Sequence, residues 1–153
     1  MGAVVTLREI TAETVRAICA LRVTPGQEAL VAPNAVSIAQ AYFEPAAWFR
    51  AIHANDEPVG FAMLYDPNRA VAPADPDVCH LWRFMIAAPF QHRGHGGAAL
   101  AQLIDHARAL PFVKTFRLSY VPADSSPRDF YVRFGFRETG EMDEDEVVMD
   151  LAL

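Results

Sequence analysis

Apolar side chains recur along the chain at two different spacings, and the change of spacing marks the elements. The most regular stretch is 96–110. There Leu103 and Ile104 follow Leu100 by three and four positions, so the three side chains would lie on one face of a helix. This spacing predicts a helix that packs one face against a sheet. Segment 4–10 alternates apolar and polar residues instead, which is typical of a half-buried strand.

The rest of the chain divides into short elements separated by turns rich in proline, glycine and acidic residues. Strands are expected over 4–10, 48–54, 59–65, 78–86, 114–121, 136–142 and 146–153, and helices over 11–21, 36–43, 96–110 and from Ser126 onward. Thr11 and Ser126 are the expected N-caps, and segments 24–34 and 66–77 are expected to be loops. The order β-α-α-β-β-β-α-β-α-β-β predicts an α/β (α+β) fold, a mixed sheet with about four helices on its faces.

Composition limits the class of protein. The 153 residues suit one domain over 1–153, and an apolar content of 52% is enough for a core. The net charge of −6 argues against a nucleic-acid partner, and no apolar run is long enough for a membrane span. Cys19 and Cys79 have neither metal-ligand nor disulfide spacing, so we expect no metal and a reducing, cytoplasmic location.

Charge is distributed unevenly along the chain. Segment 80–117 carries five bases against one acid, and segment 138–153 carries seven acids and no base. The first segment is therefore a candidate for holding an anion and the second for attracting a cation, although both patterns also occur on ordinary solvated surfaces.

A glycine cluster separates the strand over 78–86 from the helix over 96–110. Gly94, Gly96 and Gly97 follow Arg93, at the point where the free N–H groups of a helix start are expected. Such N–H groups and the helix dipole bind anions, and glycine lets a ligand approach the backbone closely. The spacing fits neither a Walker loop nor a Rossmann fingerprint. The alternative is a tight turn that binds nothing.

Two motifs carry a family resemblance. Gln91-x-x-Gly94-x-Gly96 resembles the acetyl-CoA motif of the GCN5-related N-acetyltransferases (GNAT), and segment 130–136, Phe-Tyr-Val-Arg-Phe-Gly-Phe, resembles their Tyr-x-x-x-Gly-Phe segment. The resemblance covers the whole chain in element order and implies a mostly antiparallel, seven-stranded sheet with acetyl-CoA as co-substrate. It assigns the cofactor contacts to Met85, Ile86, Gln91, His92, Arg93, Gly94, His95, Gly96, Gly97, Asp124 and Tyr131.

The chain departs from the family pattern at two positions. Asp124 stands where asparagine is usual, and Pro127 stands where alanine is usual. Aspartate still accepts a hydrogen bond and starts a turn, but it lacks the amide donor, which puts one cofactor contact in doubt.

Shorter matches extend the resemblance to a bacterial spermine/spermidine acetyltransferase group. They include Gln27, segment 31–34, segment 37–41 and segment 118–122. Membership implies a small cationic amine as acceptor, with polyamines among the candidates, and is compatible with a homodimer. The acceptor side of the family assigns substrate contacts to Glu28, Asn34, Tyr42 and Glu141.

The resemblance also implies a mechanism of direct transfer in a ternary complex. Tyr131 is the expected general acid toward the CoA sulfur, although a core tyrosine is the alternative. A backbone N–H of Met85 or Ile86 is expected to bind the thioester oxygen. Glu141 or Glu28 is the candidate base, acting through water, and each could equally be a solvated carboxylate.

Two other functions remain open at this stage. A non-catalytic acyl-CoA-binding module would need the glycines but neither Tyr131 nor an acidic acceptor side. An enzyme that acetylates a protein amine would need an open peptide groove.

Overall fold

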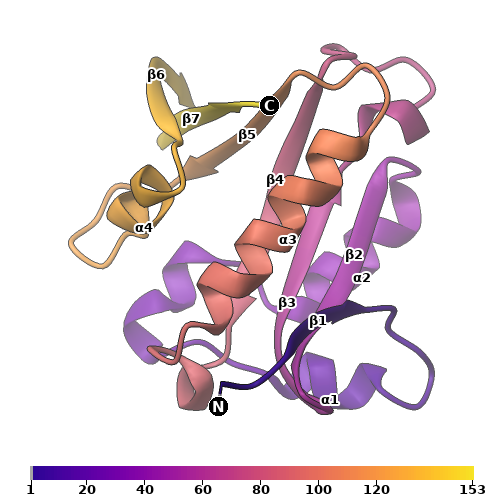
Figure 1. The fold of residues 1–153 in the computed structure, drawn as a ribbon, viewed down its shortest axis with the longest axis vertical. Helices are drawn as coiled ribbons and strands as arrows, with labels where there is room; N and C mark the ends of the chain where they lie inside the picture. Colours follow the sequence, from indigo (N-terminus) through magenta and orange to yellow (C-terminus); the bar gives the residue numbers. More distant parts are fainter. Residues whose placement is uncertain (1) are drawn as a thin grey trace.

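The computed structural model describes residues 2–153 (Figure 1). Within that range it contains the strands β1 (Val5–Arg8), β2 (Ala47–Ala54), β3 (Glu57–Tyr65), β4 (Val78–Ile86), β5 (Thr115–Tyr120), β6 (Arg137–Asp143) and β7 (Glu146–Ala152). The described α-helices are α1 (Val15–Ala20), α2 (Asn34–Phe43), α3 (His95–Ala109) and α4 (Arg128–Arg133), and the short 3₁₀ helices are η1 (Pro25–Leu30), η2 (Pro67–Arg69) and η3 (Ala88–Phe90). None of the helices in residues 2–153 is long and apolar enough to cross a membrane.

The strands form one seven-stranded sheet in the order β1-β2-β3-β4-β5-β7-β6. Neighbouring strands are antiparallel except for β4 and β5, which are parallel and are connected through α3. A parallel pair needs such a crossover helix, because a short turn cannot return the chain to the start of the neighbouring strand. The predicted fold class, element order and mostly antiparallel sheet are confirmed.

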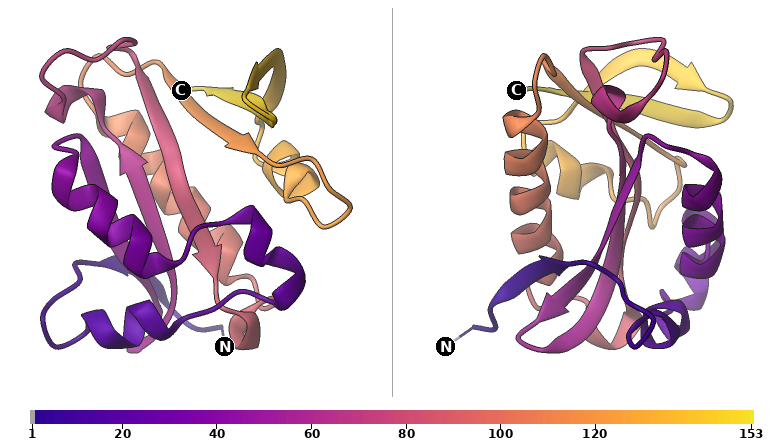
Figure 2. Two further views of the ribbon diagram at one scale, coloured as in Figure 1. Left: turned by 180° about the vertical axis from the view of Figure 1, so that it is seen from behind. Right: turned by 90° about the vertical axis from the view of Figure 1, so that its right-hand side faces the viewer.

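Helices cover both faces of the sheet. Figure 2 shows α3 on one face and α1 with α2 on the other. The core under α3 includes Leu100, Leu103 and Phe116, all fully buried, and the core on the α1 side includes Ile18 and Phe61. The regular apolar spacing of 96–110 therefore forms the buried face that it predicted.

The parallel pair separates soon after it begins. β4 and β5 pair only from Val78 to His80, opposite Thr115 to Arg117. Beyond this point β4 continues along β3, and β5 continues along β7. A register shift between Met63 and Leu64 leaves Trp82 of β4 without a partner, which is the pattern of a β-bulge. The two halves of the sheet thus open into a V.

Three local boundaries differ from the sequence-based prediction. The first helix begins at Val15 and not after Thr11, because Thr11 forms a turn in which its carbonyl accepts from the N–H groups of Thr14 and Val15. The last helix begins at Arg128 with Pro127 as its N-cap, whereas Ser126 belongs to the preceding turn. Segment 24–34 contains η1, which starts with a capping box between Thr24 and Gln27.

Replacing Gly60 with alanine is expected to lower the free energy of unfolding by about 2 kcal/mol, a typical cost of overpacking a core. A Cβ at Gly60 would lie 2.3 Å from the carbonyl oxygen of Met85 and 2.9 Å from Cδ1 of Ile86, so β3 and β4 would have to move apart. Urea unfolding measures the change. Gly26→Ala is the control, because a Cβ there meets nothing within 4 Å. Equal stability of the two variants would contradict the prediction.

Candidate active site

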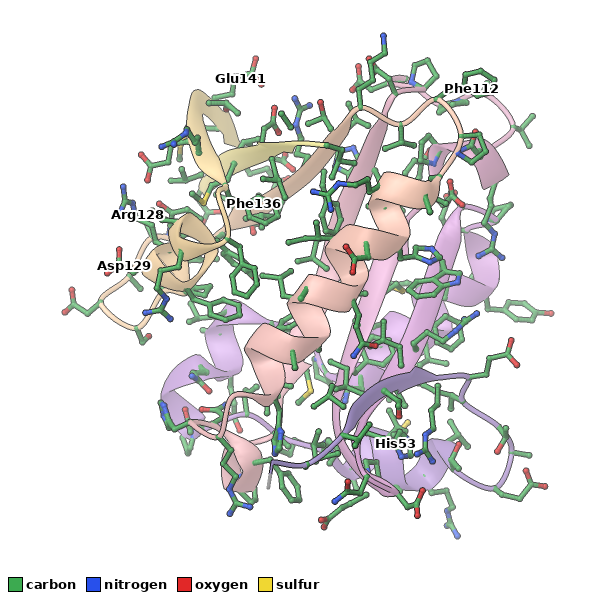
Figure 3. All side chains as sticks on the ribbon, in the orientation of Figure 1. His53, Phe112, Arg128, Asp129, Phe136 and Glu141 are labelled. Carbon is green, nitrogen blue, oxygen red and sulfur yellow. The ribbon has the colours of Figure 1, made fainter. Side chains whose placement is uncertain are left out.

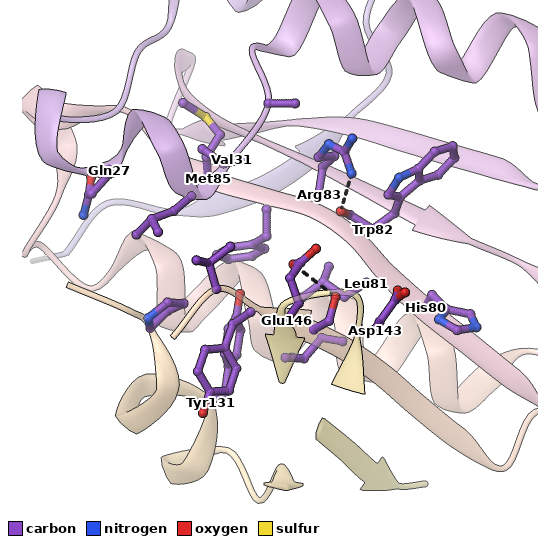
Figure 4. Close-up of a pocket in the computed structure, with 18 of the residues that line it drawn as sticks. Gln27, Val31, His80, Leu81, Trp82, Arg83, Met85, Tyr131, Asp143 and Glu146 are labelled. Atoms are coloured by element: carbon purple, nitrogen blue, oxygen red, sulfur yellow. Dashed lines mark hydrogen bonds between the residues drawn. The ribbon is translucent and has the colours of Figure 1, made fainter. Parts of the chain in front are cut away.

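A cavity of about 1010 Å³ occupies the opening between β4 and β5 (Figure 4). Its walls come from η1 and the residues after it, from β4 and β5, and from α4 and β7. Segments far apart in sequence meet here because β4 and β5 separate and leave a gap in the middle of the sheet, and these segments surround the gap. The opening is therefore a consequence of the topology, and a ligand could pass between the two strands.

The glycine cluster lies at the start of α3, beside this cavity. Gly94 has a φ of +84°, which turns the chain sharply into the helix. The first hydrogen bond of the turn runs from the N–H of Ala98 to the carbonyl of Gly94 at 3.1 Å, so the N–H groups of His95, Gly96 and Gly97 precede the helical ladder. These three donors at a helix N-terminus have the arrangement that binds phosphate.

Gly96 connects the helix start to the cavity wall. A Cβ at this position would lie 3.6 Å from Cγ1 of Ile86 and 3.7 Å from Cζ of Phe130, and both of those residues line the cavity. The helix start and the cavity are thus neighbours. An extended ligand could place an anionic group at the helix start and a reactive group in the cavity.

Gln91 ties the turn before α3 to the loop on the other side of the cavity. Its side-chain Nε2 donates to the carbonyl of Ile86 at 2.8 Å and to Oε1 of Gln27 at 2.8 Å. The backbone N–H of Thr24 also donates to Oε1 of Gln27, at 3.3 Å. Gln27 and Gln91 both line the cavity, so one hydrogen bond joins two segments of its wall that are far apart in sequence.

Three tyrosines line the cavity, and they differ in their contacts. Tyr131 of α4 is buried against the rings of Phe130 and Phe136, and burial raises the pKa of its phenol well above the ordinary value. The hydroxyl of Tyr120 donates to Oε1 of Glu138 at 2.8 Å. Tyr65 contacts His80 edge to face. Tyr131 is the tyrosine that the sequence motif predicts as the proton donor, and its phenol is neutral at neutral pH.

Met85 and Ile86 line the cavity from β4, as the sequence places them beside the glycine turn. Asn34 lies behind Met85 and is fully enclosed: its Nδ2 donates to the carbonyl of Ile18 at 3.0 Å and lies 3.7 Å from Sδ of Met85. It lines a smaller cavity of about 260 Å³ that Met85 and Glu28 share. Asn34 therefore supports Met85 from behind the wall of the larger cavity, and its contact with substrate stays a prediction.

Several segments contribute carboxylates to the cavity wall. The cavity is lined by Glu28, Glu44, Asp75, Asp143 and Glu146. The hydroxyl of Ser119 donates to Oε1 of Glu146 at 3.2 Å, which holds that half-buried carboxylate in place. Asp143 and Glu146 are the residues of the acidic tail that line the cavity, and an acceptor side at this tail stays a prediction.

Two expected acceptor residues lie elsewhere. Glu141 is exposed on β6 and is absent from the cavity lining, and Figure 3 shows it pointing away from the rest of the molecule. Tyr42 is 85% exposed on α2, where it packs edge to face on Phe43. Sequence reasoning missed Glu146, whose only signal was its place in the acidic tail.

The remaining expected cofactor residues surround the turn without lining the cavity. His92, Arg93 and Asp124 are exposed, and the guanidinium of Arg93 lies over the ring of Phe90 at 5.9 Å. His95 is buried at the start of α3. Among residues 2–153 no group of three or more histidine, cysteine or acidic side chains is placed to hold a metal ion.

Comparison with known proteins agrees with this geometry. Residues 7–136 match the model of the family described as "Acetyltransferase (GNAT) family". No curated protein matches the chain in sequence.

Solved structures share the fold at low sequence identity. An acetyltransferase from Thermus thermophilus is 17% identical over 100% of both chains, with a TM-score of 0.76. A GNAT family acetyltransferase from Elizabethkingia anophelis, solved with acetyl-CoA bound, is 20% identical over 97% of this chain and 98% of its own, with a TM-score of 0.63. The aminoglycoside acetyltransferase AAC(6')-Ib, solved with paromomycin and acetyl-CoA, is 19% identical over 97% of this chain and 93% of its own, with a TM-score of 0.77.

Proposed function

Because the chain belongs to the acetyltransferase (GNAT) family, we propose that it transfers the acetyl group of acetyl-CoA to a small amine that enters as a cation. One observation carries the acceptor half of this proposal. The cavity that contains Met85 and Tyr131 is also lined by five carboxylates, Glu28, Glu44, Asp75, Asp143 and Glu146. Carboxylates attract an ammonium group and raise its local concentration.

The donor is proposed to lie along the opening between β4 and β5. Its pyrophosphate would be bound by the N–H groups of His95, Gly96 and Gly97, which precede the helical ladder and follow Gly94, a residue without a side chain. Arg93 and His92 would add donors from the exposed turn. The thioester would then reach Met85 and Ile86, which follow one another at the end of β4.

The reaction needs a neutral amine, a stabilised oxyanion and a protonated leaving group. A lysine-like ammonium titrates near pH ~10.4, so it must lose its proton before attack. Glu146, held by Ser119 in the cavity wall, is the proposed acceptor of that proton through water. The amine nitrogen attacks the carbonyl carbon, the C–S bond breaks, and the CoA thiolate takes the proton of Tyr131. The proton that the new amide nitrogen loses then passes through water to the phenolate and restores Tyr131.

The acceptor is proposed to be a small amine with net positive charge, and polyamines such as spermidine are candidates within that class. Short sequence matches to the spermine/spermidine group support this choice, together with the acidic wall. Thiol release from acetyl-CoA in the presence of a panel of cationic, neutral and anionic amines tests the proposal. Acetylation of neutral or anionic amines with rejection of every cationic one would overturn it.

Glu146→Gln is expected to lower kcat/KM for a cationic amine about 10-fold or more, because it removes one charge from the cavity wall and the proposed proton acceptor. Part of the loss should appear as a higher KM that is less sensitive to salt. Glu141→Gln is the matched control. It removes the same charge from the same hairpin at an exposed position outside the lining, so its kinetics should stay near wild type. The opposite ranking of the two variants would return the acceptor role to Glu141.

A further inference from the structure

Arg83 lines the cavity from β4 with most of its hydrogen-bonding capacity unused (Figure 4). One terminal nitrogen donates to the carbonyl of Trp82 at 3.0 Å, and the other donates to Oε1 of Gln40 at 3.1 Å. A guanidinium has five N–H donors, so these two bonds leave three. Among the described residues Nε of Arg83 is buried and has no hydrogen-bond partner. Leaving such a donor unpaired is costly, so the site is not built for packing alone. Each terminal nitrogen keeps a second N–H, and these two N–H groups are the donors available to a ligand in the cavity.

Within the described residues, the guanidinium of Arg83 also has no carboxylate at ion-pair distance. The other arginine in the lining, Arg117, is held by both carboxylate oxygens of Asp150 at 2.7 and 2.9 Å. Burial and the nearby Arg117 lower the pKa of His80, which keeps that imidazole neutral at neutral pH. Half-burial lowers the pKa of the Arg83 guanidinium. The negative charge of Glu146, which is not in an ion pair with Arg83, raises that pKa in part.

These observations call for an anionic group of the acceptor. We infer that the acceptor of the proposed acetyl transfer carries a carboxylate that binds Arg83 in addition to the amine that is acetylated, as a basic amino acid does. The inference rests on the proposed function and narrows its acceptor class. A guanidinium matches a carboxylate in two parallel hydrogen bonds, which fix orientation as well as charge.

The positions along β4 determine which amine would react. Arg83 and Met85 are two residues apart on one strand, so they are separated by roughly 7 Å. Arg83 lies on the face of the sheet that carries α2, since it donates to Gln40, and Met85 packs on that face too. A carboxylate bound at Arg83 would therefore leave a side-chain amine, several bonds away, near the end of β4 where the thioester is proposed to lie.

The rest of the lining would favour this single orientation. A carboxylate placed against Asp143 or Glu146 would meet like charge, whereas the ammonium group is attracted there. An acceptor with two ammonium groups and one carboxylate can pair its carboxylate with Arg83 and place an ammonium group near Asp143 and Glu146. It remains a cation overall, in agreement with the proposed function.

Matched acceptors that differ only in the carboxylate test the inference. Thiol release from acetyl-CoA is measured with L-lysine, L-lysine amide and cadaverine, and with L-ornithine and putrescine. Wild type is expected to show kcat/KM at least 10-fold higher for each amino acid than for its decarboxylated partner. Arg83→Gln is expected to bring that ratio close to one. Arg83→Lys is expected to give an intermediate ratio, because it keeps the positive charge but loses the two parallel N–H donors of the guanidinium.

Arg50→Gln is the matched control. Arg50 is likewise half-buried, donates to the carbonyl of its preceding residue at 2.7 Å and lies over a tryptophan ring, but it is outside the cavity lining. Its substitution should leave the preference for the carboxylate unchanged. Thermal unfolding of both variants separates a loss of folding from a loss of recognition.

Equilibrium binding separates this inference from the proposed function. Calorimetry with CoA-saturated protein measures L-lysine and cadaverine binding without any reaction. Binding of L-lysine that weakens at least 10-fold in Arg83→Gln supports the carboxylate site, even if no thiol is released and the proposed reaction fails. Equal or tighter binding and turnover of cadaverine in wild type overturns the carboxylate site and leaves acetyl transfer to a cationic amine standing.

Discussion

Tyr131→Phe is expected to lower kcat about 100-fold while the affinity for acetyl-CoA stays within a few-fold of wild type. Loss of a positioned general acid typically removes 10²–10⁴ of rate, and the lower end applies when solvent can still supply a proton. The substitution removes only a hydroxyl. The ring that packs on Phe130 and Phe136 is kept, so the fold and the cofactor path are preserved.

The surroundings of Tyr131 suit a proton donor. Burial raises the pKa of its phenol, so the hydroxyl stays protonated throughout the physiological range. Activity should therefore show no loss between pH 7 and about 10 that comes from ionisation of Tyr131.

The same shift sets the direction of the pH dependence of folding. Above about pH 10 a tyrosine in the unfolded chain loses its proton, whereas buried Tyr131 keeps it. The folded state then binds more protons than the unfolded state, so the free energy of unfolding falls as the pH rises. Tyr131→Phe should reduce this alkaline loss of stability.

Tyr65→Phe is the control for Tyr131→Phe. Tyr65 lines the same cavity but lies at the His80 end, next to the short parallel pairing of β4 and β5. Steady-state turnover with a good amine acceptor and calorimetry with acetyl-CoA measure the two effects separately. Unchanged turnover of Tyr131→Phe, or an equal loss in Tyr65→Phe, would make Tyr131 a core residue and remove it from the mechanism.

Local patterns predicted most of the elements. The apolar spacing in 96–110 gave α3 to within one residue at each end, because its face packs against a sheet as the period requires. The start of the first helix was missed because Thr11 and Thr14 exchange hydrogen bonds in a turn. Threonine is favoured both at helix N-caps and in turns, so the residue type alone does not distinguish the two.

The acceptor side could not be predicted to the residue, because it depends on register. β6 and β7 pair with a shift between Glu138 and Met142, where Gly140 has a φ of +85°. The shift interrupts the strict alternation of the strand, so Glu141 and Asp143 do not follow one face as they would in a regular strand. Glu146 lies opposite Asp143 after the tight turn and reaches the cavity. The count of charges along the sequence identified the acidic segment 138–153. Only the register of β6 and β7 shows which of its side chains reach the cavity.

Gly94→Val is expected to weaken acetyl-CoA binding about 30-fold or more, which corresponds to roughly 2 kcal/mol. Gly94 has a φ of +84° and is the last residue before α3. A residue with a Cβ pays roughly 1–2 kcal/mol in this left-handed region, and a β-branched side chain fits it worst. The chain would relieve the strain by rotating the turn, which would turn the N–H groups of His95 and Gly96 away from the phosphate that they are proposed to bind.

The chain offers a glycine with the same conformation as the control. Gly140 has a φ of +85°, and a Cβ at either glycine would meet nothing within 4 Å. Gly140→Val should therefore cost a similar amount of stability, but it lies in β6, at the opposite end of the molecule from the start of α3 in Figure 1. Calorimetry with acetyl-CoA and thermal unfolding of both variants compare the two effects. If both variants lose stability alike and only Gly94→Val loses the cofactor, the N–H groups at the start of α3 hold the pyrophosphate. Wild-type affinity in Gly94→Val would place the cofactor elsewhere.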